Sequence, residues 1–228
     1  MTQTPFIITL DGPAGVGKTT LARCLAQRLG LAYLDTGAMF RCLALKLGSG
    51  AEKLPEAELR LQCARWIFRL NGSGEKTVLT CNDIPVGNEI RTEEVAMLAS
   101  RIATVPLIRD MLREAQQSMG RCSSIVTEGR DMGTVVFPEA RCKFFLDASP
   151  EVRALRRQRD LEKRGEKADL ATLAALIRQR DHQDRNRAIA PLRPADDAHL
   201  VDTSSLEIEE VLAHLLEHVR HCGGPLPR

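Results

Sequence analysis

The sequence predicts an α/β fold built on a parallel β-sheet. A short apolar, β-branched run at 6–10 leads into a glycine-rich loop and then into a helical pattern that Gly30 closes. A second apolar run at 31–34 precedes another helical pattern, which begins after Asp35. Parallel strands need crossover connections of about a dozen residues or more, usually helices, so this alternation indicates a parallel sheet.

Length and composition limit the class of protein. A chain of 228 residues is expected to form one large domain, or one domain with an insertion. Its 43% hydrophobic and 27% charged residues are typical of a soluble globular protein. The sequence contains no apolar run long enough to span a membrane and no N-terminal pattern of a secretory signal, so we expect a cytoplasmic protein without a membrane partner. The net charge of +2 argues against a nucleic-acid partner.

The middle of the chain departs from the alternation. Two short apolar runs at 66–70 and 77–80 flank a polar, glycine-containing turn, which predicts a hairpin, and 84–86 adds an edge strand. Because this β patch interrupts the strand–helix order, we expect an inserted subdomain at 63–100. The core would then comprise 1–62 and 101–222.

The second half returns to the alternation of strands and helices. Apolar runs predict three further strands at 124–126, 142–146 and 200–201, which completes a five-stranded parallel sheet flanked by helices. A helical pattern begins at Thr92, breaks near Pro106 and continues to about Met119. Further helical patterns lie at 150–163, 169–187 and 208–219. The terminal segment 223–228 is expected to be disordered.

A phosphate-binding loop follows the first strand. Residues 12–19 match the pattern G-x-x-x-x-G-K-[ST] between a predicted strand and a predicted helix. Glycines let backbone N–H groups turn inward around a phosphate, Lys18 can reach the β- and γ-phosphates, and the Thr19 hydroxyl can bind Mg²⁺. We therefore expect a site for ATP with Mg²⁺. The nucleotide-binding residues are Gly12, Pro13, Ala14, Gly15, Val16, Gly17, Lys18, Thr19 and Thr20.

Arginines suggest a second phosphate site. The chain lacks the N-K-x-D motif that reads guanine and an apolar strand ending in Asp-Glu, so neither a GTPase nor a motor-type ATPase is favoured. Residues 150–194 carry 12 basic and 7 acidic side chains. Guanidinium groups stay charged and suit phosphate oxygens, so a phosphorylated acceptor is expected. The arginines in short polar motifs are Arg41, Arg91, Arg109, Arg130, Arg180, Arg185 and Arg187.

The cysteines and histidines predict no metal site. The seven cysteines are odd in number and no pair has C-x-x-C spacing, which argues against a disulfide framework and against zinc. His214, His218 and Cys222 share a helical spacing that could mark a metal face. Because they lie opposite the apolar stripe of their helix, we expect a solvated face instead.

Several motifs together resemble the bacterial cytidylate kinases, a family of P-loop nucleoside monophosphate kinases. The resemblance covers about residues 5–220. Its motifs lie at 11–19, 35–41, 89–95, 128–138, 145–148 and 180–187, and the blocks E-G-R-D-M-G-T-V-V-F-P and R-D-x-x-D-R-x-R are specific to this family. The resemblance implies a P-loop kinase core, a CMP-binding insertion and an arginine-rich lid at 150–168. It also implies a monomer that transfers the γ-phosphoryl group of ATP to CMP and dCMP in pyrimidine nucleotide metabolism.

The same resemblance implies roles for individual residues. Lys18, Arg130 and Arg187 would be catalytic. The CMP phosphate would be held by Thr36, Arg41, Arg130 and Arg187, the cytosine edge by Ser100, Arg109 and Asp131, and the sugar hydroxyls by Arg180 and Asp184. The lid over ATP would carry Arg153, Arg156, Arg157 and Arg159, with Arg157 in contact with the nucleotide. Each of these four also has an ordinary interpretation as a solvated or structural ion-pair residue.

Chemistry supports a cytosine reader independently of the resemblance. The Asp131 carboxylate can accept from the N4 amine of cytosine, whereas it would face the O4 acceptor of uracil. Two alternatives stay open: a kinase for UMP or another small acceptor, and a nucleotide-binding switch that hydrolyses slowly. Asp35 could orient Mg²⁺-bound waters or cap the following helix, and we favour the cap. Phe40 stands where many relatives have Tyr, so one hydroxyl contact is expected to be missing.

Overall fold

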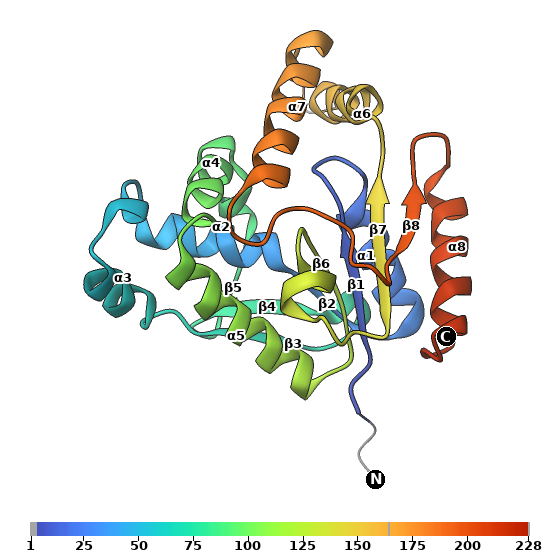
Figure 1. Cartoon of the computed structure of the whole chain (residues 1–228), viewed down its shortest axis with the longest axis horizontal. Coiled ribbons are helices and arrows are strands. Elements are labelled where there is room, and N and C mark those ends of the chain that lie inside the picture. The colour runs from blue at the N-terminus through green and yellow to red at the C-terminus, as the bar shows by residue number, and fades with distance from the viewer. Residues whose placement is uncertain (1–3, 164, 228) are drawn as a thin grey trace.

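A five-stranded parallel sheet forms the centre of the molecule (Figure 1). The computed structural model describes residues 4–163 and 165–227. The sheet order is β2-β6-β1-β7-β8, and each neighbouring pair is parallel, as the sequence predicts. The strands are β1 Ile7–Asp11, β2 Ala32–Asp35, β6 Ile125–Gly129, β7 Cys142–Asp147 and β8 His199–Asp202.

Helices cover both faces of this sheet and split its core into two clusters. One cluster packs Leu25 of α1 and Leu215 of α8 against the sheet, and the other packs Leu43 of α2 and Leu112 of α5 against the opposite face. This double covering explains why the strands are near-continuous apolar runs rather than alternating ones. The helices are α1 Lys18–Leu29, α2 Thr36–Leu47, α3 Glu56–Cys63, α4 Glu93–Ile102, α5 Pro106–Cys122, α6 Pro150–Glu162, α7 Leu170–Asn186 and α8 Ile208–His221.

Two helical segments are absent from the sequence prediction. Helix α3 buries only Leu59 and Cys63, so it lacks the apolar stripe by which a helix is recognised. A single π-helical turn at Met132–Val136 follows β6, and its first backbone N–H groups bond to the side chain of Asp11 rather than within the turn. Such turns depend on a tertiary partner, which local periodicity does not reveal.

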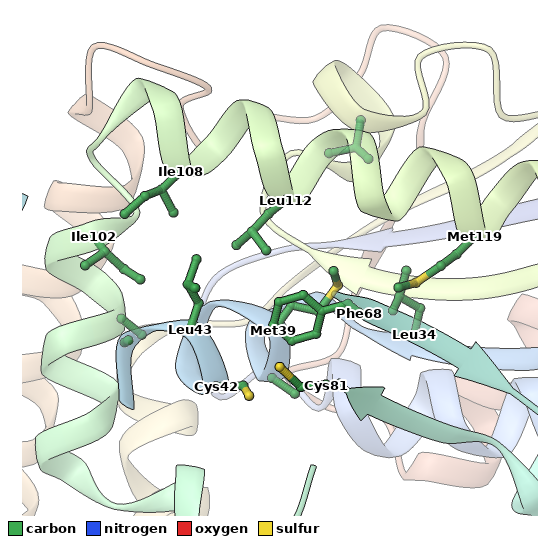
Figure 2. Packing of buried hydrophobic residues seen from close by; sticks show 14 of the residues in the cluster. Leu34, Met39, Cys42, Leu43, Phe68, Cys81, Ile102, Ile108, Leu112 and Met119 are labelled. Carbon is green, nitrogen blue, oxygen red and sulfur yellow. The ribbon is translucent and has the colours of Figure 1, made fainter. Parts of the chain in front are cut away.

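A three-stranded antiparallel sheet forms where the sequence predicts a hairpin and an edge strand. Its strands are β3 Phe68–Asn71, β4 Val78–Cys81 and β5 Ile84–Pro85. Its buried residues Phe68 and Cys81 belong to the same cluster as Met39 of α2, and Figure 2 shows Leu112 of α5 pointing toward them. The small sheet therefore shares its hydrophobic core with one face of the large sheet, while the expected boundaries at 63 and 100 remain a prediction.

Helices α6 and α7 lie beyond the carboxyl ends of β7 and β8 (Figure 1). At the other end of the chain, Gly223 and Gly224 donate backbone hydrogen bonds to Arg220 O and Val219 O, 3.1 and 3.0 Å away, so they continue the end of α8. The predicted disorder of 223–228 remains a prediction for the rest of that segment, whose last residue lies outside the described ones. No helix within residues 4–163 or 165–227 has the length and apolarity needed to cross a bilayer.

The packing of α8 on the sheet gives a first prediction. Leu215 is completely buried, so Leu215→Ala should lower the free energy of unfolding by about 2–5 kcal/mol through lost contacts and a residual cavity. Urea denaturation followed by circular dichroism measures this change. The control is Leu226→Ala, at a leucine that is 67% exposed and should change the free energy by less than about 0.5 kcal/mol. Equal effects of the two substitutions would contradict the packing described.

Candidate active site

The parallel register brings the ends of β1, β2 and β6 to one edge of the sheet. Asp11 is paired with Gly129, and Asp35 with Glu128. The loops that follow the carboxyl ends of parallel strands are where α/β proteins bind ligands, because they meet outside the same edge of the sheet. Here they are the phosphate loop after β1 and the segment 130–136 after β6.

The phosphate loop requires glycine at its first position. Gly12 has a φ of +151°, and a Cβ atom there would lie 2.1 Å from the carbonyl oxygen of Leu146. Gly15 and Gly17 also have positive φ angles, +83° and +92°, which side chains rarely tolerate. The backbone can therefore turn its N–H groups inward toward the N-terminus of α1, in an arrangement suited to bind phosphate.

Lys18 is buried within this loop. Its Nζ donates to the carbonyl oxygen of Pro13, 2.6 Å away. The residue as a whole is only 6% exposed to solvent. Burial, followed by the positive charge of Arg130, lowers the pKa of Lys18 to about 7, although Glu128 and Asp11 partly oppose this. A bound phosphate would restore the charge of the ammonium group, because it supplies the opposite charge that burial otherwise denies.

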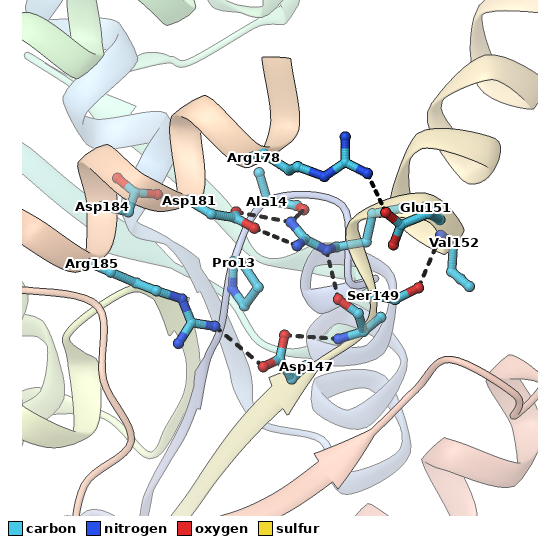
Figure 3. Close-up of polar contacts among 12 residues, drawn as sticks. Pro13, Ala14, Asp147, Ser149, Glu151, Val152, Arg178, Asp181, Asp184 and Arg185 are labelled. Atoms are coloured by element: carbon cyan, nitrogen blue, oxygen red, sulfur yellow. Dashed lines mark hydrogen bonds and ion pairs between the residues drawn. The ribbon is translucent and has the colours of Figure 1, made fainter. Parts of the chain in front are cut away.

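Arg153 supports the loop from α6. It is 2% exposed, and its guanidinium donates to the carbonyl oxygens of Ala148 and Ala14, 2.9 and 3.1 Å away. It also forms a bidentate ion pair with Asp181 of α7. Figure 3 shows Asp181 close to Ala14 of the phosphate loop. The interpretation of Arg153 as a structural ion-pair residue is therefore confirmed, and the residue is a buried brace between the phosphate loop and both helices. Its place in a lid over ATP remains a prediction.

Two of the three predicted base readers, Arg109 and Asp131, line a small cavity. Arg109 and Asp131 form a buried ion pair, and Arg187 approaches the other oxygen of Asp131 at 3.4 Å. The cavity has a volume of about 40 Å³, and Phe40 forms another part of its wall. Arg109 lies 5.8 Å from the centre of the Phe40 ring.

A second pair of predicted residues lies next to this cavity. Arg130 donates to the carboxylate of Asp184 at 2.8 Å. Burial raises the pKa of Asp184, but the positive charges of Arg130 and Arg180 and the hydrogen bond outweigh it and hold that pKa below its ordinary value. Removal from water and the neighbouring Arg130 lower the pKa of Arg180. Two arginines, Arg130 and Arg180, thus share the single carboxylate of Asp184, so this group carries a net positive charge.

Residues at the start of α2 complete the expected acceptor site. The Thr36 hydroxyl donates to the backbone carbonyl of Glu128 at 2.7 Å. Asp35 accepts from the N–H of Ala38 at 2.8 Å, which confirms the predicted helix cap, and it also pairs with Arg41 at 3.1 Å and Arg91 at 3.7 Å. One carboxylate thus orders the helix terminus and two arginines.

Two predicted site residues are not brought into these clusters. Ser100 is exposed on α4 and does not line the cavity beside Asp131. Arg157 pairs with Glu93 of α4 at 2.7 Å, which links α6 to the start of that helix. Their roles toward cytosine and ATP remain predictions. Arg156 contacts the Thr203 hydroxyl at 3.2 Å, so it is tied to the end of β8.

Sequence reasoning missed three buried polar residues at the same edge. Asp11 accepts from the N–H groups of Met132 and Gly133 at 2.9 and 2.7 Å, while burial raises its pKa to about 6. Glu128 accepts from the Tyr33 hydroxyl at 2.5 Å. Gln116 is 1% exposed, lines the cavity, and has an amide nitrogen without a partner among the described residues. A polar residue at the end of a predicted buried strand is the signal that could have identified the first two.

The donor set at the phosphate loop suits Mg²⁺. Burial and the nearby Asp35 carboxylate raise the pKa of Glu128, and the hydroxyl of Thr19 lies beside it. Mg²⁺ prefers oxygen ligands and is usually bound through one or two carboxylates together with substrate phosphates. A divalent cation would relieve the repulsion between these carboxylates, so Thr19, Asp35 and Glu128 fit the ion directly or through its waters.

A phosphate loop on a doubly covered parallel sheet, facing a second site lined with arginines, defines a P-loop phosphotransferase. A crystal structure of shikimate kinase from Bacteroides thetaiotaomicron has a similar fold, with a TM-score of 0.50, 15% identity, and coverage of 94% of this chain and 98% of that one. The chain belongs to the cytidylate kinase family, whose model, described as cytidylate kinase, matches residues 8–221.

Individual relatives agree with the family match. A cytidylate kinase of Nitratidesulfovibrio vulgaris is 58% identical over 96% of this chain and 94% of the relative. A cytidylate kinase of Oleidesulfovibrio alaskensis is 56% identical over 94% of this chain and 98% of the relative. The similarity therefore spans both the phosphate loop and the arginine-lined second site.

The brace at Arg153 gives a second prediction. Arg153→Met removes one partner of a buried pair and leaves the Asp181 carboxylate uncompensated, so the free energy of unfolding should fall by about 3–5 kcal/mol. Urea denaturation measures the change. Arg159→Met, at an exposed position of the same helix, is the matched control and should stay within about 0.5 kcal/mol of the parent protein. A stable Arg153→Met protein would refute the brace.

Proposed function

We propose that this chain transfers the γ-phosphoryl group of ATP to CMP and dCMP, giving CDP or dCDP and ADP. The observation that carries the proposal is the buried Asp131 carboxylate, which faces a cavity beside the phosphate loop and lies between Arg109 and Arg187. This arrangement offers both an acceptor and cationic donors to a nucleobase, next to arginines suited to its phosphate. The family membership of the chain supports the same activity.

Base recognition follows from the hydrogen-bonding pattern of cytosine. Its N4 amine would donate to Asp131, and Arg109 would donate to N3 or O2. Uracil would place its O4 acceptor against the carboxylate, and a buried polar group left unpaired costs about 1–3 kcal/mol. That cost corresponds to roughly 5- to 150-fold in binding. Ser100 is proposed as a third reader, which would require α4 to approach the base.

The phosphate and sugar of the acceptor would occupy the neighbouring charged groups. Thr36, Arg41, Arg130 and Arg187 are proposed to bind the phosphate, and Arg180 and Asp184 the sugar hydroxyls. In the structure Arg41 and Arg130 are paired with Asp35 and Asp184. A doubly charged phosphate is a stronger partner than a carboxylate, so these pairs would rearrange when the acceptor binds.

The transfer itself needs no general base from the protein. The nucleophile is a phosphate oxygen of CMP, which is already anionic near neutral pH. Catalysis then depends on positioning the two phosphates and on offsetting charge as the γ-phosphoryl moves, for which Lys18, Arg130 and Arg187 are proposed. Bound Mg²⁺, held by Thr19 and the nearby carboxylates, would offset further phosphate charge. Closure of α6 and α7 with Arg157 would exclude water.

The two alternatives differ in what they require of the acceptor. A UMP kinase would favour a hydrogen-bond donor at position 131 instead of a carboxylate. A slow nucleotide-binding switch would consume ATP without an acceptor and would leave the arginines beside Asp131 without a function. We further propose that the protein acts as a monomer in the cytoplasm on small molecules alone.

Acceptor specificity gives the decisive prediction. ADP production from Mg-ATP should be fast with CMP and dCMP and slow with UMP or AMP, as measured in a coupled assay. Asp131→Asn presents an amide donor in place of one carboxylate oxygen, so kcat/KM for CMP should fall by roughly 5- to 150-fold while UMP loses less or gains.

The control for that variant lies in the same cavity wall. Asp110→Asn alters a carboxylate that pairs with Arg113 at 2.9 Å and is exposed, so the ratio of CMP to UMP turnover should not change. Equal losses for both acceptors in Asp131→Asn would remove Asp131 as the base reader. Turnover that is independent of any acceptor would instead identify a hydrolase or a switch.

The depressed pKa of Lys18 gives a prediction about proton linkage. Between about pH 7 and its ordinary value of 10.5, Lys18 is neutral in the free protein and charged beside a phosphate. At about pH 8.5, binding of ATP should therefore take up close to one proton, and affinity should weaken as the pH rises through this range. Calorimetry in two buffers of different ionisation enthalpy measures the uptake.

The variant Lys18→Ala should lose both this proton uptake and most turnover. We expect kcat to fall by about 10²–10³-fold, the usual loss when a charge-stabilising donor is removed. Lys76→Ala, at an exposed position in the turn between β3 and β4, should retain both properties. Proton uptake that persists in Lys18→Ala would assign the titrating group elsewhere, and an unchanged kcat would refute the role of the lysine.

A further inference from the structure

Three potential metal ligands meet at the opposite end of β7 from the phosphate loop. Cys142, the first residue of β7, lies near His218 in the last turn of α8 and Cys222 directly after that helix. One ligand atom from each residue, a sulfur or a ring nitrogen, lies within 4.8 Å of the other two. Cys142 is completely buried, and the other two side chains are half-buried.

The predicted solvated face is wrong for two of its three members. His214 is exposed, but His218 packs its ring against Phe144 of β7 at 5.3 Å and stacks on His199 of β8 at 4.3 Å. Residues 218 and 222 are four apart, so they lie on one side of the helix and face the strand together. The third ligand is 76 positions earlier in the sequence, which is why no short cysteine motif revealed the cluster.

We propose that Cys142, His218 and Cys222 form a site for Zn²⁺, with water as the fourth ligand. Two thiolates and a neutral imidazole are a known ligand set for zinc. Binding would release the two thiol protons to solvent. Tetrahedral coordination with Zn–S bonds of about 2.3 Å places two sulfurs roughly 3.8 Å apart. The ligand atoms lie within 4.8 Å of one another, so the two sulfur atoms would have to approach by about 1 Å or less. Rotation of the half-buried side chains of His218 and Cys222 can supply this movement.

This site is independent of the Mg²⁺ site at the phosphate loop. Cys142 and the carboxyl end of β7 are separated by roughly 16 Å of extended chain. Sulfur ligands select zinc over Mg²⁺, which prefers oxygen. A bound zinc ion would join the end of α8 to the central sheet, so its expected effect is on stability rather than on phosphoryl transfer.

Cobalt provides a spectroscopic test of the proposal. Co²⁺ added to the full-length, nucleotide-free protein in oxygen-free buffer with a non-thiol reductant should bind in one equivalent. It should produce thiolate-to-cobalt charge-transfer absorption and the visible bands of tetrahedral Co²⁺, and Zn²⁺ should displace it. Oxygen ligands at the phosphate loop cannot give the charge-transfer band, so the two metal sites are distinguished.

Variants assign the signal to these residues. Cys222→Ser and His218→Gln should weaken Co²⁺ and Zn²⁺ binding by at least about 100-fold, because loss of outer partners alone costs about 10–100-fold. Cys122→Ser and His214→Asn, at exposed positions, are the matched controls and should bind normally. The absence of a thiolate band in the parent protein, or an unchanged band in Cys222→Ser, would overturn the proposal. Circular dichroism verifies that each variant is folded.

Discussion

The carboxylate of Asp11 connects the two halves of the active site. It lies at the end of the central strand, directly before the first glycine of the phosphate loop, and accepts two backbone hydrogen bonds from the turn that follows Asp131. The loop proposed to bind ATP and the carboxylate proposed to read cytosine are therefore positioned by the same residue. Burial raises the pKa of Asp11 to about 6. The two N–H donors oppose this shift, because hydrogen bonds from Met132 and Gly133 favour the charged carboxylate.

A second property of the site is that nearly every arginine already has an acidic partner. Arg41, Arg109, Arg130 and Arg153 pair with Asp35, Asp131, Asp184 and Asp181. Only the last pair also braces the phosphate loop through backbone carbonyls, and Figure 3 shows its aspartate beside the loop. The other pairs hold the guanidinium groups of Arg41, Arg109 and Arg130 beside fixed carboxylates. If these arginines bind phosphates as proposed, their existing order would reduce the side-chain entropy lost on binding.

Local sequence patterns predicted the elements that form through local forces. The strand before the phosphate loop, the hairpin around 71–77 and the five-stranded sheet are all observed, because apolar runs and glycine turns specify them directly. The interpretation of Asp35 as a helix cap is also confirmed, since its partner is three residues away. The sequence did not distinguish a solvated Arg153 from one in a structural ion pair. Its prediction failed for His218 and Cys222, because the packing of α8 on β7 decides which way these side chains face.

The sequence by itself determined the phosphate loop, the parallel sheet and the family of the chain, because each depends on residues that are close together or on motifs of fixed spacing. Only the tertiary structure decided which charges are paired, which are buried, and which side chains from distant segments meet. Asp11 with Met132, Arg153 with Asp181, and Cys142 with Cys222 are contacts across many residues of chain. Their partners are selected by strand register and helix packing, which no local pattern contains.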